Sequence, residues 1–171
     1  IAHQAEDLQA QIARWIGTDE PQSTLLLSPP GYGKTTLLRE WVRYFSDRGF
    51  TAAIADERSE IAALADGVPQ LAVGRCTDVM EGCSKWQAAV MLLKTMSPAL
   101  LALDEITAPE DAKAVSLCTH CGTAVIACAH AAGLDDLRQR PIYRELLALG
   151  AFHQAVIIEK QDGQRVYRME R

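Results

Sequence analysis

The sequence of 171 residues lacks long apolar runs, has few aromatic residues and carries no excess of basic ones. No apolar run approaches the ~18 residues that a membrane-spanning helix needs. The first residues contain neither the basic nor the apolar segment of a secretory signal peptide. The formal net charge of −5 and the lack of interleaved basic and aromatic residues disfavour nucleic acid as a partner. We therefore expect a cytoplasmic protein that does not bind nucleic acid.

An initiator methionine is also missing, and we interpret the chain as a domain cut from a longer protein. Its length suits a single hydrophobic core, and its composition is ordinary for a globular domain. We expect one domain over residues 1–171, in which residues 1–22 form an N-terminal helix and a connector.

The five cysteines do not complete a metal motif. An odd count without a signal peptide indicates reduced thiols. Cys118 and Cys121 have the inner spacing of a zinc knuckle, but the second pair of ligands that a structural zinc site requires is missing. We expect these thiols to be small buried hydrophobic groups and expect no zinc.

Apolar runs alternate with segments of helical periodicity along the chain. The expected strands are residues 23–27, 51–55, 99–103 and 123–128. The expected helices are residues 1–16, 34–46, 84–96 and 109–120, with one or two short helices in 134–149. Residues 58–84 indicate loop and short elements, and residues 152–158 and 165–169 indicate a terminal hairpin. This order predicts an α/β fold with a mostly parallel sheet covered on both faces.

Residues 28–35 read SPPGYGKT, which fits the phosphate-loop pattern G-x-x-x-x-G-K-[ST] except at its first position, where Ser28 replaces glycine. Two glycines let the backbone N–H groups turn toward phosphate oxygens. Lys34 is expected to reach the β- and γ-phosphates, and Thr35 to offer its hydroxyl to Mg²⁺. The loop leaves a strand and enters a helix, as the motif requires. The expected nucleotide-binding residues are Pro30, Gly31, Tyr32, Gly33, Lys34, Thr35 and Thr36.

Residues 100–105 read LLALDE, an apolar strand that ends in two acids and is typical of a Walker B segment. Asp104 is expected to hold Mg²⁺ together with Thr35. Glu105 is expected to orient and deprotonate the attacking water. The two motifs predict a three-layer P-loop NTPase fold of the RecA-like type that binds ATP with Mg²⁺ and hydrolyses it.

Polar residues follow two other expected strands, at the edge where ligands gather in open α/β sheets. Glu57 could share in activating the water, and Arg58 could stabilise phosphoryl charge. His130 could sense the γ-phosphate. With Lys34 and Glu105, these residues make up the expected catalytic set, although a surface charge cluster and a structural histidine remain alternatives.

These motifs, in this order, resemble the stage III sporulation AA family, within the broader group of type II/IV secretion ATPases. The resemblance spans about residues 25–152. It implies that residues 56–60 correspond to the aspartate box of the secretion ATPases and His130 to their histidine box. It also implies a mother-cell cytoplasmic ATPase, peripheral to the membrane through its partners, that works with a membrane channel complex and assembles as a hexameric ring in its full-length form. The resemblance rests on residues 29–39, 56–62, 77–79, 94–98, 104–106, 129–130 and 137–141.

The sequence departs from the family pattern at three places. Ser28 replaces glycine, Cys76 interrupts the expected Arg-Thr-Asp-Val segment, and Thr107-Ala108 replace a Gly-Arg pair. These departures favour an alternative function, a nucleotide-dependent binding module or scaffold with little turnover. A small-molecule kinase and a nucleic-acid motor are weaker alternatives. The arginines that could act between subunits are Arg58, Arg75, Arg138 and Arg140.

Overall fold

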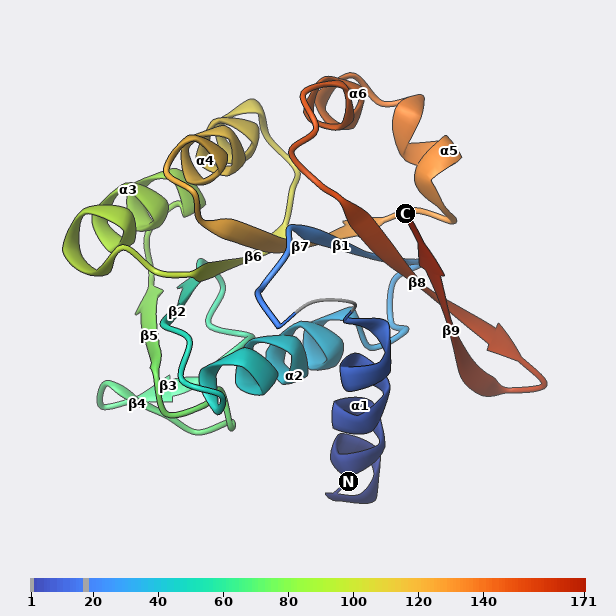
Figure 1. Ribbon diagram of the computed structural model, residues 1–171, viewed down its shortest axis with the longest axis horizontal. Coiled ribbons are helices and arrows are strands. Elements are labelled where there is room, and N and C mark those ends of the chain that lie inside the picture. The colour runs from blue at the N-terminus through green and yellow to red at the C-terminus, as the bar shows by residue number, and fades with distance from the viewer. Residues whose placement is uncertain (1, 17–18) are drawn as a thin grey trace.

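The computed structural model describes residues 2–16 and 19–171. Within these residues, a seven-stranded sheet has the order β5-β2-β6-β7-β1-β8-β9 (Figure 1). Neighbouring strands are parallel except for β9, which runs antiparallel to β8. The strands are β1 (Thr24–Ser28), β2 (Ala52–Asp56), β5 (Thr77–Glu81), β6 (Leu100–Glu105), β7 (Ala124–His130), β8 (Gln154–Gln161) and β9 (Gln164–Glu170). A separate ribbon pairs β3 (Leu64–Ala65) with β4 (Val68–Pro69).

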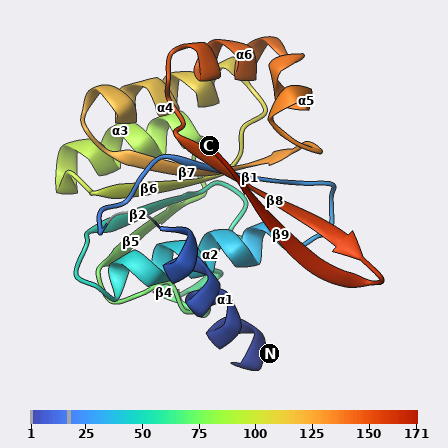
Figure 2. The same cartoon turned by 45° about the vertical axis from the view of Figure 1, so that its right-hand side comes forward.

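Helices cover both faces of the sheet and complete a three-layer arrangement (Figures 1 and 2). One face carries α1 (Ala2–Trp15) and α2 (Lys34–Ser46). The other face carries α3 (Lys85–Met96), α4 (Pro109–His120), α5 (Leu134–Arg138) and α6 (Pro141–Ala148). None of the helices in the described part of the chain combines the length and apolar character of a membrane span.

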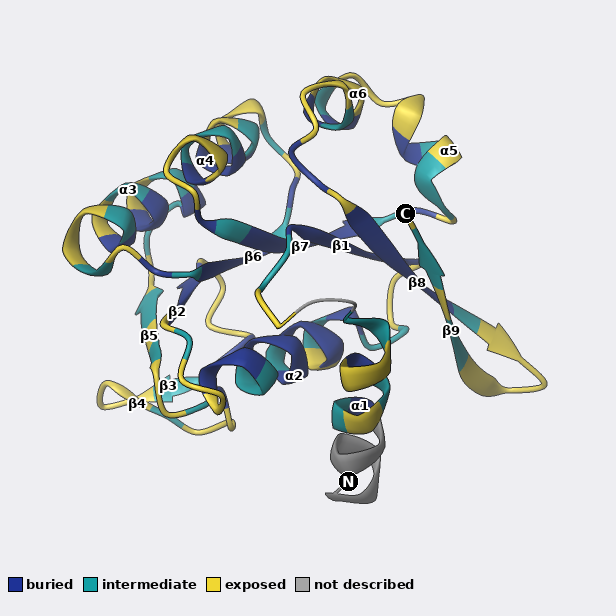
Figure 3. Ribbon diagram, in the orientation of Figure 1, coloured by how far each residue is buried: buried dark blue, intermediate teal, exposed yellow. Residues whose placement is uncertain are grey.

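The core follows from the alternation of side chains along apolar strands. Leu25 and Leu27 of β1 face the layer of α3, α4 and α6, whereas Leu26 faces α2. The central strands are therefore buried on both sides, as Figure 3 shows in dark blue. Helix α2 supplies Leu37 and Trp41 to the second cluster, because residues four apart share one helix face.

The predicted fold class is confirmed, including the mostly parallel sheet and the terminal hairpin. The predicted helices 34–46 and 109–120 coincide with α2 and α4. Residue 1 of the predicted first helix and residues 17–18 of the connector lie outside the described residues. The single-domain assignment remains a prediction.

Two predicted boundaries differ in a way that matters for the site. Strand β6 continues through Asp104 and Glu105, and β7 continues to His130. Residues 58–84 contain loop and short elements, as predicted, but the prediction did not identify one of these elements as the edge strand β5 beside β2. The residues of β5 are half-buried or exposed, so its sequence does not show the apolar run of a central strand.

Candidate functional site

The strand register brings the carboxyl ends of four strands into one row. Ser28 at the end of β1 pairs with His130 at the end of β7, and Glu105 at the end of β6 pairs with Cys128 of β7. Strand β2 follows beside β6. A cavity of about 250 Å³ lies at this edge, where an open α/β sheet binds its ligands. Its lining comprises Pro30, Gly31, Gly33, Lys34, Thr35, Thr36, Glu57, Arg58, Glu60, Lys85, Asp104, Glu105, Thr107, Cys128 and His130.

The candidate phosphate loop (residues 28–35) forms one wall of this cavity. Gly31 and Gly33 have φ values of 79° and 91°, in the left-handed region that glycine adopts most readily. Gly33 is the N-cap of α2, so the first turn of that helix opens at the cavity, where Thr35 and Thr36 line it. The N-terminus of a helix favours anions because its N–H groups lack helical partners. Tyr32 is the one predicted site residue that does not line the cavity.

Lys34 folds back onto the start of its own loop. Its ammonium lies 3.2 Å from the Ser28 carbonyl oxygen, 3.3 Å from Ser28 Oγ and 3.4 Å from the Pro29 carbonyl oxygen. Burial lowers the pKa of Lys34 below its ordinary value, although the charges of Glu105 and Asp104 oppose the shift. A phosphate in the cavity would favour the charged ammonium. Ser28, which stands where the motif has glycine, is fully buried, and its hydroxyl donates a hydrogen bond to the Pro29 carbonyl at 2.7 Å.

A bulge at the end of β6 explains how two consecutive acids reach one cavity. Neighbouring residues of a regular strand point to opposite faces of the sheet. The pairing of β6 with β7 shifts between Leu103 and Glu105, which leaves Asp104 as an extra residue. Both Asp104 and Glu105 consequently line the cavity, where they can serve different functions.

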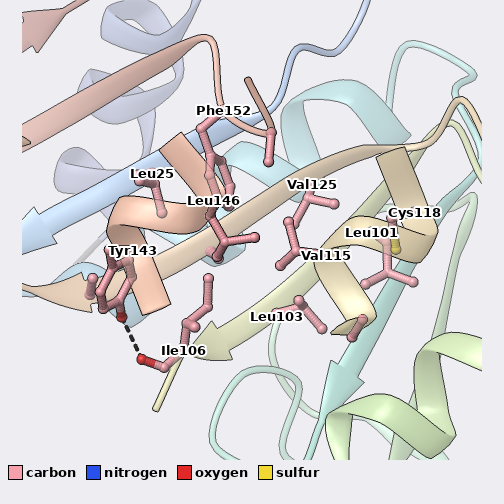
Figure 4. Close-up of a cluster of buried hydrophobic side chains, with 14 of the residues drawn as sticks. Leu25, Leu101, Leu103, Ile106, Val115, Cys118, Val125, Tyr143, Leu146 and Phe152 are labelled. Atoms are coloured by element: carbon pink, nitrogen blue, oxygen red, sulfur yellow. Dashed lines mark hydrogen bonds between the residues drawn. The ribbon is translucent and has the colours of Figure 1, made fainter. Parts of the chain in front are cut away.

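One contact holds the Glu105 side chain, and a second holds the backbone of the residue after it. His130 Nδ1 lies 2.9 Å from Glu105 Oε1, which links the ends of β6 and β7. On the other side, the hydroxyl of the buried Tyr143 in α6 donates a hydrogen bond to the carbonyl of Ile106, the next residue in the chain (Figure 4). These contacts fix the carboxylate and the backbone that carries it.

The segment after β2 is held in place by Asp56, which is fully buried. Its carboxylate accepts backbone N–H hydrogen bonds from residues 60–62 at 3.0–3.2 Å. Arg39 of α2 donates to the carbonyl oxygens of Ile61 and Glu60 at 2.6 and 3.2 Å. Asp56 thus shapes the turn that holds Glu57 and Arg58 at the cavity.

Lys85, the first residue of α3, is a buried cation in the cavity wall that the sequence analysis missed. Its ammonium lies 2.9 Å from Glu57 Oε2 and 3.4 Å from Asp111 Oδ2. Burial alone would lower the pKa of Lys85, but the hydrogen bonds and charges of Glu57 and Asp111 raise it above its ordinary value. Asp111 also accepts the backbone N–H groups of Thr107 and Ala108 at 2.9 and 3.1 Å. Lys85 therefore connects the segments that follow β2, β5 and β6.

We expect Lys85→Met to lower the free energy of unfolding by roughly 1–3 kcal/mol, because the buried Asp111 carboxylate would lose its cation. Urea denaturation at neutral pH measures this change. Lys113→Met is the matched control, since Lys113 is exposed on α4. Equal stability of the two variants would contradict the interpretation of Lys85 as a structural cation.

The remaining predicted arginines lie outside the cavity. Arg138 forms an ion pair with Asp135 at 2.6 Å, and the Arg140 guanidinium lies 3.4 Å from the Asp136 carboxylate. Each arginine therefore has an acidic partner close to it in the sequence. Arg58 is the only arginine among the described residues that line the cavity. Cys118 is a buried core thiol, and burial raises its pKa to about 12. Cys121 is exposed, so the expectation of a buried thiol was wrong there, because Cys121 follows the last residue of α4 at the surface. The absence of zinc stays a prediction.

Comparison with known proteins places this geometry in a family. The chain is 33% identical over 168 residues to stage III sporulation protein AA of Bacillus subtilis (strain 168), a match that covers 95% of this chain and 55% of the relative. It is similar in fold to the ATPase DotB of Legionella pneumophila, with a TM-score of 0.65, 17% identity, and coverage of 94% of this chain and 47% of that one. The VirB11 ATPase from the Brucella suis type IV secretion system, solved with sulphate, gives a TM-score of 0.63, 14% identity, and coverage of 99% and 52%.

These likenesses agree with the resemblance expected from the sequence. The chain spans about half the length of each of these proteins, so the comparisons describe this domain. The two solved structures support a shared fold. The family described as "Sporulation stage III, protein AA" matches residues 1–168. The chain therefore belongs to the sporulation stage III, protein AA, family.

Proposed function

We propose that the cavity binds ATP with Mg²⁺ and hydrolyses its terminal phosphoanhydride bond. The observation that carries this proposal is the meeting of Lys34, Asp104 and Glu105 at one cavity beside the N-terminus of α2. These groups are a phosphate cation, a metal-binding carboxylate and a candidate base. Mg²⁺-dependent release of phosphate from ATP by the purified chain tests the proposal, and binding of ATP without release would limit it to binding.

Lys34 changes partners when the phosphates bind. Its ammonium leaves the carbonyl oxygens of Ser28 and Pro29 and donates to β- and γ-phosphate oxygens, which are stronger acceptors because they are charged. The Thr35 hydroxyl and the Asp104 carboxylate are oxygen donors at the same cavity, so they fit a magnesium site completed by phosphate oxygens and water. A bound Mg²⁺ would offset negative charge on the β- and γ-phosphates.

Glu105 is the group that we assign to water activation. Its carboxylate orients a water molecule and accepts its proton as the water oxygen forms a bond to the γ-phosphorus and the bond to the β–γ bridging oxygen breaks. ADP and inorganic phosphate are the products. His130 fixes the orientation of Glu105 from β7. Glu57 is engaged by the Lys85 ammonium, which favours a supporting role for Glu57 in positioning the water or the phosphate.

The cellular role rests on family membership and on the fold. DotB is named an ATPase and VirB11 an ATPase of a type IV secretion system. The family is a sporulation family. We propose that the full protein works in the mother-cell cytoplasm, where ATP hydrolysis energises a secretion-like channel complex during sporulation. Stimulation of phosphate release by membranes that carry this complex would support the role.

We expect the specific activity of the isolated chain to rise with protein concentration. The cavity contains Arg58 but no further arginine among the described residues, and Thr107-Ala108 stand after Ile106, where the resemblance to the family leads us to expect Gly-Arg. An arginine supplied by a neighbouring subunit can raise the hydrolysis rate by ~10³-fold or more. We therefore expect a mainly monomeric species with slow turnover at low concentration.

Sedimentation and phosphate release over the same concentration series measure this behaviour. Specific activity that stays constant while the mass stays monomeric would show that one chain holds the complete site. The ring proposed for the full-length protein would then depend on regions beyond this domain or on partners.

The same lack of a second cavity arginine favours an alternative function, a nucleotide-dependent binding module with little turnover. Such a module would bind ATP at the candidate phosphate loop and leave it intact. Conversion of bound ATP to ADP distinguishes this alternative from the ATPase.

A further inference from the structure

The β8–β9 hairpin extends past the candidate phosphate loop. Strand β8 runs parallel to β1, with Leu27 paired to Ile157. Strand β1 ends at Ser28, whereas β8 continues to Gln161 before the chain turns into β9. The outer part of the hairpin therefore projects beyond the carboxyl edge of the sheet, as Figures 1 and 2 show.

Two basic residues of this hairpin contact the loop. Lys160 Nζ lies 4.4 Å from the centroid of the Tyr32 ring, a cation–π contact. The guanidinium of Arg165 covers Gly33, since a Cβ atom added to that glycine would lie 3.1 Å from Arg165 Cζ. Lys160 and Arg165 are direct register partners on β8 and β9. The two cations are thus set against neighbouring residues of the loop, Lys160 against Tyr32 and Arg165 against Gly33.

Lys160 and Arg165 lack carboxylate partners among the described side chains. In this they differ from Arg168, which lies on the same hairpin. Arg168 on the same strand lies 3.1 Å from Glu159 and also pairs with Glu170. Arg165 and Lys160 are exposed, and they lie beside a helix N-terminus that itself favours anions. These two cations therefore place positive charge beside the N-terminus of α2.

The acids lie on the other side of the loop. Asp104 and Glu105 end β6 and Glu57 follows β2, and both strands lie on the β7 side of β1. Strands β8 and β9 lie on the opposite side of β1. If the γ-phosphate is directed toward the acids, the nucleoside end of ATP must leave the loop toward the hairpin.

We propose that Arg165, assisted by Lys160, binds the α-phosphate and ribose end of the nucleotide. The inference rests on the proposed function, because it assigns the second end of the same nucleotide site. A guanidinium donates two parallel hydrogen bonds to phosphate oxygens, and a neighbouring ammonium adds charge without a fixed geometry. The hairpin thereby binds a part of the nucleotide that ATP and ADP share.

Calorimetric titration of Arg165→Ala with ADP and with ATP, each with Mg²⁺, tests this inference. We expect the affinity for both nucleotides to fall by about tenfold or more, and by similar factors. Arg165→Lys should recover part of the loss. Arg168→Ala is the matched control on the same strand, and we expect its affinities to stay within about twofold of wild type because its carboxylate partners lie on the hairpin.

The outcomes separate this inference from the proposed function. Failure of the wild-type chain to bind either nucleotide would contradict both. Wild-type binding with no loss in Arg165→Ala would overturn the role of the hairpin alone. A loss for ATP with unchanged ADP affinity would also overturn it, because Arg165 would then contact the γ-phosphate. Thermal melting of each variant verifies that the chain is folded.

Discussion

Lys34→Ala should weaken the binding of ATP with Mg²⁺ by about 2–4 kcal/mol. The ammonium is the cavity cation carried by the candidate phosphate loop itself, and the substitution removes its charge-assisted hydrogen bonds to phosphate. Isothermal titration calorimetry measures the change. We expect the fold to survive, because the acceptors that lose the Lys34 ammonium are neutral carbonyl oxygens and not a buried carboxylate.

Lys94→Ala is the control for loss of a positive charge, because Lys94 is exposed near the end of α3 and does not line the cavity. We expect this variant to bind ATP like the wild type. Equal ATP affinity in the wild type and in Lys34→Ala would show that residues 28–35 do not form the nucleotide site.

Glu105→Gln should reduce ATP hydrolysis by ~10²-fold or more while ATP binding persists. The amide keeps the size of the side chain but cannot accept the proton of the attacking water. Phosphate release and calorimetry on the same preparation separate the two effects. His130 keeps a hydrogen-bonding partner in this variant, so the ends of β6 and β7 should stay connected.

Glu110→Gln is the matched control, since Glu110 is an exposed acid of α4 outside the cavity. Glu57→Gln tests whether the acid held by Lys85 shares in water activation. Turnover at the wild-type rate in both Glu105→Gln and Glu57→Gln would place water activation on another group.

The candidate phosphate loop could be predicted from sequence because its chemistry is local. Within eight residues, two glycines, a lysine and a threonine occupy fixed positions between an apolar strand and an amphipathic helix. The acids of β6 were recognisable for the same reason. The spacing did not reveal how both reach one cavity, because that requires the bulge at Asp104, which depends on pairing with β7.

The other parts of the site depend on contacts between distant segments. Lys85 lies 28 residues from Glu57 and 26 from Asp111 in the chain. Its place at the cavity follows from β5, whose half-buried residues do not mark it as a strand. If β5 had been predicted as a parallel strand, the start of α3 would also have been predicted to lie at the carboxyl edge of the sheet. The approach of Arg165 to Gly33 similarly depends on the lengths of β8 and β9, which extend beyond the predicted hairpin.

A single-turnover reaction tests the central claim most directly. The chain is held in excess over radiolabelled ATP with Mg²⁺, and the nucleotide is quenched and separated over time. We predict that bound ATP converts to ADP and inorganic phosphate in the wild type, and that conversion stops with EDTA and is strongly slowed in Glu105→Gln. ATP that stays bound and intact through the time course would contradict the ATPase account and establish the binding module in its place.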